Sequence, residues 1–103
     1  MRELAISRAA EADVLEIWCY VFEHNPPAAD RVVDEIVSHY TLLLDQPFIG
    51  SERQYSGGAF RELTVGNYII FCRVTSTKVV ISRVLHGARD HSQLLSSDME
   101  GED

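Results

Sequence analysis

Residues 83–90, RVLHGARD, contain the side chains of this sequence that are best suited to chemistry. Arg83, His86, Arg89 and Asp90 lie within eight positions, at the end of the last strongly apolar stretch. A histidine can transfer protons near neutral pH, and arginines can hold a phosphate through paired hydrogen bonds. Three interpretations are open: a catalytic cluster, a binding edge, or an ordinary solvated strand end.

Cleavage of RNA through its own 2′-hydroxyl would be the natural reaction for such groups. It needs a base, donors that hold the phosphate, and an acid for the leaving oxygen. His86 is the candidate acid or base, and Arg61, Arg73 and Arg83 are candidate phosphate ligands. A regular strand over 78–86 places Arg83 and His86 on opposite faces, and only a bulge would change that alternation. The pattern therefore favours a binding edge. It would favour a catalytic cluster only if the strand contained a bulge.

The net charge of −7 is distributed unevenly along the chain. Residues 1–52 carry −7, residues 53–89 carry +5, and residues 90–103 carry −5. A protein that works among ribosomal RNA phosphates is expected to be strongly basic overall, which disfavours that function here. The positive block predicts an acidic partner segment on this region.

Length and composition predict a cytoplasmic domain without a metal or cofactor. The 103 residues, 46% of them apolar, suit one domain with one hydrophobic core. No apolar run approaches the roughly 20 residues that span a bilayer, and the start, MRELAIS, lacks the features of a signal peptide. Cys19 and Cys72 are not in metal-binding or disulfide-framework spacings, so we expect reduced thiols.

The elements that must position these side chains begin with a strand and two helices. Residues 3–7 alternate as a short strand, and Ser7 is placed to cap the next helix. Apolar positions predict that helix over 8–24. The segment HNPPAAD interrupts it, with Asn25 as a possible cap, and a stripe over 29–44 predicts a second helix. The short link makes the helices an antiparallel hairpin.

The second half of the chain is predicted to form a loop and three strands. Residues 46–58 have the proline and glycine content of a connecting loop. Strands are expected over 59–65, 68–74 and 78–86, with Gly66-Asn67 as a type II′ turn between the first two.

The predicted fold class is α+β, in the order β-α-α-β-β-β, with an antiparallel sheet packed on an α-helical hairpin. Residues 1–90 are expected to form this single domain. Residues 91–103 are expected to form an acidic, flexible tail.

Several segments in this order resemble the RelE/ParE superfamily of toxins from bacterial toxin-antitoxin systems. They are NPPAA, LLLDQPFIG, FRELTVGNYIIFCRV and above all ISRVLHGARD. The resemblance runs from about Arg2 to Asp90 and is closer to the ParE branch, often called plasmid stabilisation proteins, whose last strand commonly ends in a sequence like H-G-x-R-D. It implies a type II toxin that arrests growth until a cognate antitoxin, encoded by an adjacent gene, neutralises it.

The two branches of the superfamily imply different activities. RelE-like members are ribosome-dependent mRNA endoribonucleases, whereas ParE-like members inhibit DNA gyrase. The lysine-rich stretch and the tyrosine near the C-terminus expected of the ribonuclease branch are missing, since Lys78 is the only lysine and no tyrosine follows Tyr68. We therefore expect a gyrase inhibitor and not an enzyme. The alternatives are a ribonuclease that uses His86, Arg61 and Arg83, or a decayed member that is no longer toxic.

Partner contacts are expected on the strands. The resemblance implies an antitoxin whose flexible C-terminal half folds on this toxin as a hetero-oligomer. DNA binding would then belong to the antitoxin and not to this chain. Two other roles remain open, since Arg61 could pair with an acid of the helical hairpin and His86 could bond a backbone carbonyl. The residues predicted to contact a partner are Arg61, Arg73, Arg83, His86, Arg89 and Asp90.

Overall fold

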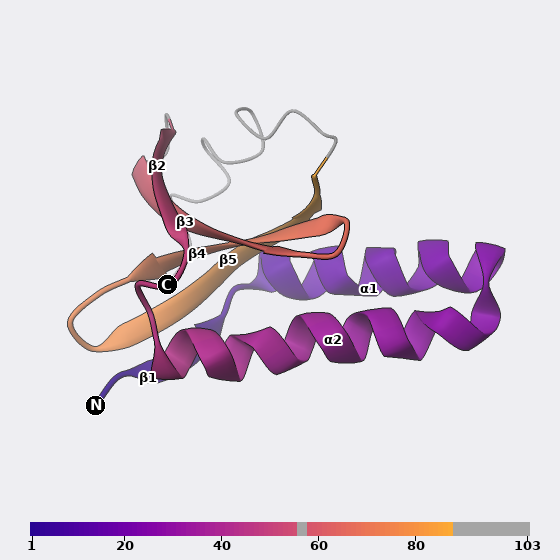
Figure 1. Cartoon of the computed structure of the whole chain (residues 1–103), viewed down its shortest axis with the longest axis horizontal. Helices are drawn as coiled ribbons and strands as arrows, with labels where there is room; N and C mark the ends of the chain where they lie inside the picture. Colours follow the sequence, from indigo (N-terminus) through magenta and orange to yellow (C-terminus); the bar gives the residue numbers. More distant parts are fainter. Residues whose placement is uncertain (56–57, 88–103) are drawn as a thin grey trace.

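A five-stranded sheet covers a pair of antiparallel helices in the computed structural model, which describes residues 1–55 and 58–87 (Figure 1). The elements are β1 (Glu3–Ile6), α1 (Arg8–His24), α2 (Pro26–Asp45), β2 (Ser51–Tyr55), β3 (Gly58–Val65), β4 (Tyr68–Val74) and β5 (Lys78–His86). The strand order is β1-β5-β4-β3-β2. The predicted α+β class and the helical hairpin are confirmed.

The sheet differs from the prediction in two respects. It is mixed, because β1 pairs in parallel with β5 while the other neighbours are antiparallel. It also contains β2, which forms within the predicted loop over 46–58 and pairs with β3 at the edge of the sheet. The sequence of β2, SERQY, is almost wholly exposed, so it lacks the apolar alternation by which a half-buried strand is recognised.

Ser7 connects the first strand to the first helix as predicted. Its Oγ accepts a hydrogen bond from the Ala10 N–H at 3.0 Å and donates one to the Ser82 carbonyl oxygen at 2.7 Å. One side chain therefore caps α1 and holds the helix against β5. Asn25 occupies the N-cap position of α2, but within the described residues its side chain makes no capping hydrogen bond.

The hydrophobic core lies between the helices and one face of the sheet. The other sheet face has a smaller buried cluster of Phe60, Phe71 and Leu85, against which Tyr55 and Ile69 pack. The buried residues of the main core are Ala10, Ile17, Ile36, Tyr40, Leu43, Val65, Ile70, Cys72, Val79, Ile81 and Val84.

A β-bulge interrupts the last strand. Cys72 of β4 pairs with Ile81, but the preceding residue, Phe71, pairs with Arg83, so Ser82 is an extra residue in β5. Ile81 and Val84 consequently both belong to the main core, although regular alternation would place them on opposite faces. β5 is therefore bulged at Ser82, the case that the sequence analysis left open.

The bulge does not bring Arg83 and His86 onto one face. Both residues follow it, and residues paired across neighbouring strands share a face. Arg83 is opposite Phe71 of the smaller cluster, whereas His86 is opposite Tyr68, which packs against the main core. The predicted separation of the two side chains is thus retained beyond the bulge.

Gly66 forms the turn between β3 and β4. Val65 pairs with Tyr68, so the turn has two central residues. Gly66 has a φ of +59°, and among the described residues positive φ values occur only at glycine. This backbone agrees with the predicted type II′ turn, which needs a positive φ at its first central position alone.

Candidate partner-binding site

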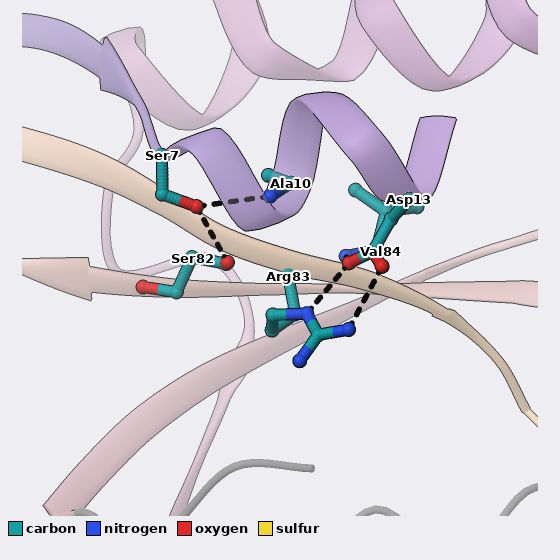
Figure 2. A network of polar contacts seen from close by, with 6 residues as sticks. All are labelled: Ser7, Ala10, Asp13, Ser82, Arg83 and Val84. Atoms are coloured by element: carbon teal, nitrogen blue, oxygen red, sulfur yellow. Dashed lines mark hydrogen bonds and ion pairs between the residues drawn. The ribbon is translucent and has the colours of Figure 1, made fainter. Parts of the chain in front are cut away.

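Arg83 is held by the first helix and is not displayed on the sheet. Its Nε donates to Asp13 Oδ2 at 2.7 Å and its Nη2 donates to Asp13 Oδ1 at 2.8 Å (Figure 2). The Arg83 residue is only 9% exposed, and Asp13 only 7%. This is a buried, two-point ion pair between α1 and β5.

The Asp13 carboxylate also completes the hydrogen bonding of β5. β1 ends at Ile6, opposite Ile81, and beyond that point the edge of β5 lies beside α1. There the Val84 N–H donates to Asp13 Oδ2 at 3.0 Å (Figure 2). The carboxylate therefore accepts three hydrogen bonds, from a side chain and from a strand edge that β1 does not cover.

Arg61 fastens the connection between α2 and β2. Its Nη2 donates to the carbonyl oxygens of Phe48 at 2.9 Å and Gly50 at 2.6 Å. Its Nη1 lies 3.8 Å from Glu52 Oε1, and its guanidinium lies over the Phe48 ring, 5.3 Å from the centroid. The acid that it contacts is thus in β2 and not in the helical hairpin.

Arg73 shares a cavity with Arg61 at one end of the sheet. The pairing of β3 with β4 begins at Arg61 and Cys72, so Arg73 lies just beyond the paired positions. The Arg73 guanidinium lies over the Phe60 ring, with its Cζ 4.3 Å from the ring centroid. The cavity has a volume of about 350 Å³ and is lined by both arginines. The Nε of Arg61 is buried there and, among the described residues, has no hydrogen-bond partner.

His86 lies at the opposite end of the sheet. Its side chain is exposed, and its ring meets Tyr68 edge to face, with 5.4 Å between centroids. The predicted site residues therefore separate into the Arg61 and Arg73 cavity, the buried Arg83, and the exposed His86. Arg89 and Asp90 lie outside the described residues, as does the predicted tail.

A polar cluster that the sequence did not indicate joins β2 and β3. The Tyr55 hydroxyl donates to Glu62 Oε2, and Arg53 Nε lies 3.8 Å from the same oxygen. Burial, together with the hydrogen bond to Glu62, raises the pKa of Tyr55 to about 12, so this phenol stays protonated at neutral pH. Arg53 and Tyr55 are two positions apart and so share one face of β2. The sequence could have indicated that they act together only if residues 51–55 had been recognised as a strand.

A groove with a volume of about 690 Å³ lies between α1 and the end of the β3–β4 hairpin. We call it the α1 groove. Its lining includes Leu85 and four apolar residues of or beside the main core: Ile17 and Val21 of α1, Val32 of α2 and Val84 of β5. These four residues extend the main core to the surface, so a ligand here would meet an apolar floor.

The rim of the α1 groove is aromatic and carries two histidines and one exposed carboxylate. It contains Glu16, Tyr20, His24, Tyr68 and His86. Tyr20 is 60% exposed, and its ring centroid lies 4.4 Å from that of His24. Burial raises the pKa of Tyr68, and the neighbouring Tyr20 phenol raises it further. In the sequence these α1 residues resemble an ordinary solvated helix face, so only the fold reveals the groove.

No set of three or more His, Cys, Asp or Glu side chains is arranged to hold a metal within residues 1–55 and 58–87. In the same residues, neither helix is long and apolar enough to cross a membrane.

Comparison with known proteins agrees with the resemblance in the sequence. Toxin ParE1 of Caulobacter vibrioides is 28% identical over 95 residues, which are 88% of this chain and 98% of that protein. The structure of the chromosomal ParDE TA system from P. aeruginosa matches with a TM-score of 0.73, over 84% of this chain and 96% of that one. At a sequence identity of 24%, this match shows a shared fold.

A family model covers nearly the whole described chain. The model for the ParE toxin of the type II toxin-antitoxin system parDE matches residues 4–91. These residues include every element from β1 to β5 apart from the first position of β1. The chain therefore belongs to the ParE toxin family of type II toxin-antitoxin systems.

Proposed function

We propose that this ParE-family toxin arrests growth in the cytoplasm by binding and inhibiting DNA gyrase, and that an antitoxin encoded by an adjacent gene neutralises it. The toxin would act by protein contact, without chemistry of its own. Operator DNA would be bound by the antitoxin in a toxin-antitoxin complex. A plasmid that carried both genes would be stabilised by the pair.

The observation that carries this proposal is the Asp13–Arg83 ion pair. A ribonuclease of this fold would need arginines that reach a phosphate beside an acid-base group. Arg83 instead donates two hydrogen bonds to the buried Asp13 carboxylate, and the His86 side chain lies on the opposite face of β5. A guanidinium already paired in this way gains little by binding a phosphate, since the Asp13 carboxylate would be left buried without its partner.

The residues proposed to contact gyrase are Arg73 at one end of the sheet and His86 at the other, together with Arg89 and Asp90. Arg61 belongs to the same cavity as Arg73 and is expected to shape it. Arg83 is expected to act indirectly, by holding the end of β5 that leads to His86. The net positive charge of residues 53–89 supports an acidic contact region on the target.

Expression in bacteria tests the toxin itself. The chain expressed alone should arrest growth, and co-expression with the neighbouring gene should restore it. Normal growth despite verified soluble protein would contradict the proposal and favour a decayed member.

Two assays with purified protein separate the candidate targets. In a gyrase supercoiling assay, the toxin should inhibit the enzyme, whereas mRNA in a translating ribosome extract should remain intact. Cleavage of mRNA with unchanged supercoiling would establish the ribonuclease instead. Arg73→Gln and Arg89→Ala should weaken gyrase inhibition about tenfold or more, as expected when a contact worth 1.4 kcal/mol is lost. Arg31→Ala is the control, because Arg31 is exposed and, among the described residues, its side chain donates a hydrogen bond only to the Pro27 carbonyl of its own helix.

A further inference from the structure

The cavity that Arg61 and Arg73 share has an excess of positive charge. Among the described residues that line it, these two arginines are the cations and Glu52 is the only carboxylate. Glu52 Oε1 lies 3.8 Å from Arg61 Nη1, which is too far for a hydrogen bond, and the Glu52 side chain is 59% exposed. Water therefore screens this pair, and the cavity remains complementary to an anion.

Neighbouring groups hold both guanidinium groups in place. Arg61 Nη2 donates to two backbone carbonyl oxygens in the connection between α2 and β2, and the Arg73 guanidinium lies over the Phe60 ring. A Cβ on Gly58 would lie 3.1 Å from Arg73 Nη2, so the glycine leaves room for that group. An anion that enters the cavity would meet donors that are already positioned, which lowers the entropic cost of binding.

Arg61 also keeps donors that no described residue uses. Its Nη2 makes the two bonds to backbone carbonyls, whereas its Nε and Nη1 make no hydrogen bond within the described part of the chain. The Nε is buried, and a buried donor without an acceptor keeps the cost of its desolvation. A carboxylate is a strong acceptor for a guanidinium, because hydrogen bonds with a charged group are roughly twice as strong as neutral ones.

A third arginine lies beside the cavity. Arg2 Nε donates to the Thr75 carbonyl oxygen at 2.7 Å, and Thr75 lines the cavity. The guanidinium groups of Arg2 and Arg61 both lie over the ring of Phe48, with their Cζ atoms 5.4 and 5.3 Å from its centroid. Phe48 is exposed, so this end of the sheet displays an aromatic ring in contact with two cations. Aromatic and arginine side chains carry much of the binding energy in protein interfaces.

The lining favours an acidic side chain over a nucleic acid. Ala59, Phe60 and Val74 give the cavity apolar surface beside the arginines, which suits the methylene groups of aspartate or glutamate. The volume of about 350 Å³ exceeds the roughly 30 Å³ share of one water molecule more than tenfold, so a whole side chain fits. A nucleic acid gains affinity through many phosphates, and the net charge of −7 opposes such binding.

We propose that the Arg61–Arg73 cavity is a carboxylate pocket that takes up one aspartate or glutamate side chain of gyrase. This inference rests on the proposed inhibition of gyrase. It gives Arg61 a direct contact with the target, in addition to its contacts within the fold. It also makes Glu52 a competitor, because the incoming carboxylate replaces Glu52 beside the Arg61 guanidinium.

Removal of the competing carboxylate tests the pocket by a gain of binding. Glu52→Gln should lower the toxin concentration that half-inhibits gyrase supercoiling by about two- to fivefold, the range expected for one exposed ion pair. Glu35→Gln is the matched control, since Glu35 is an exposed glutamate of α2 that does not line the cavity and forms no ion pair with a described residue. Its inhibition should be unchanged. Partial unfolding would weaken inhibition, so it cannot mimic the predicted gain.

A titration without gyrase tests the chemistry of the ligand. The probes are glutamate blocked at both its amino and α-carboxyl groups, glutamine blocked in the same way, and inorganic phosphate. Nitrogen–proton NMR spectroscopy follows the Nε–H signals of the arginines. Blocked glutamate should shift the Arg61 and Arg73 signals to saturation, whereas blocked glutamine should not. The signal of Arg31, which is exposed on α2, should stay unchanged throughout.

The outcomes separate this inference from the proposal on which it rests. If the natural toxin does not inhibit supercoiling, the gyrase proposal fails and the assigned occupant of the pocket falls with it. If the natural toxin inhibits gyrase, but Glu52→Gln gives no gain or blocked glutamate shifts neither arginine, only the carboxylate pocket is overturned. Shifts with phosphate that match or exceed those with blocked glutamate would identify a phosphate site and likewise overturn it. A gain at Glu52→Gln together with larger shifts by blocked glutamate supports both.

Discussion

The carboxylate of Asp13 and the guanidinium of Arg83, 70 positions apart in the sequence, form two hydrogen bonds inside the protein. The pair joins α1 to β5 at the point where β1 no longer covers the strand edge. Arg83, which the sequence analysis named as a candidate phosphate ligand, is therefore a structural residue. The same helix displays Glu16 and Tyr20 to solvent, so α1 both stabilises the fold and lines the α1 groove.

Removing one member of this pair should destabilise the domain strongly. Asp13→Ala leaves the buried Arg83 charge without its carboxylate, so we expect the free energy of unfolding in urea to fall by about 3–5 kcal/mol. Asp34→Ala, at an exposed position of α2, should change it by less than about 0.5 kcal/mol. The double variant Asp13→Leu/Arg83→Met should be more stable than Asp13→Ala, and equal losses in all three would refute a special role for the pair.

Two glycines should respond differently to alanine. A Cβ at Gly50 would lie 2.3 Å from the Glu62 carbonyl oxygen and 2.9 Å from its carbon, so backbone must move. At Gly66, a Cβ meets no described atom within 4 Å, and the cost is the positive φ alone, about 1–2 kcal/mol. The Tm of Gly50→Ala should therefore be well below the Tm of Gly66→Ala. The reverse order would contradict the close approach of β3 to Gly50.

Tyr40 should make the protein less stable in alkali. Burial, reinforced by the Asp13 and Glu11 carboxylates, raises its pKa from 10.0 to about 12. The phenol therefore ionises first in the unfolded chain, and the stabilisation is lost as pH rises from about 10 to about 12. Urea unfolding of Tyr40→Phe should show a smaller decline across this range than the natural protein. Identical declines would mean that Tyr40 ionises equally in both states.

The two cysteines should differ in reactivity. Cys19 is exposed on α1, whereas Cys72 is buried in β4, and burial raises its thiol pKa from 9.0 to about 11. A thiol reagent at pH 8 should modify Cys19 within minutes and reach Cys72 only after unfolding, because thiolate and access are both needed. Counting modified thiols with and without urea measures this, with Cys19→Ser as the control. Rapid modification of Cys72 in the folded protein would show that β4 opens.

Much of the fold is determined by local pattern. The apolar stripes of α1 and α2, the strands β3, β4 and β5, and the Ser7 cap were all predicted, because each depends on residues close in sequence. β2 was not predicted, since its exposed polar residues are strand-forming only through pairing with β3 at the sheet edge.

The candidate site depended on tertiary structure to a greater extent. Residue types identified the arginines and His86 as candidates, and the alternation of a strand separated Arg83 from His86. The sequence by itself determined the element order, the positive block of residues 53–89 and the resemblance to ParE toxins. Only the tertiary structure decided that Ser82 is a bulge and that Asp13 binds Arg83. The bulge depends on the register of β5 against β4. The ion pair depends on the parallel β1–β5 pairing, which ends at Ile81 and leaves the rest of the strand edge to α1.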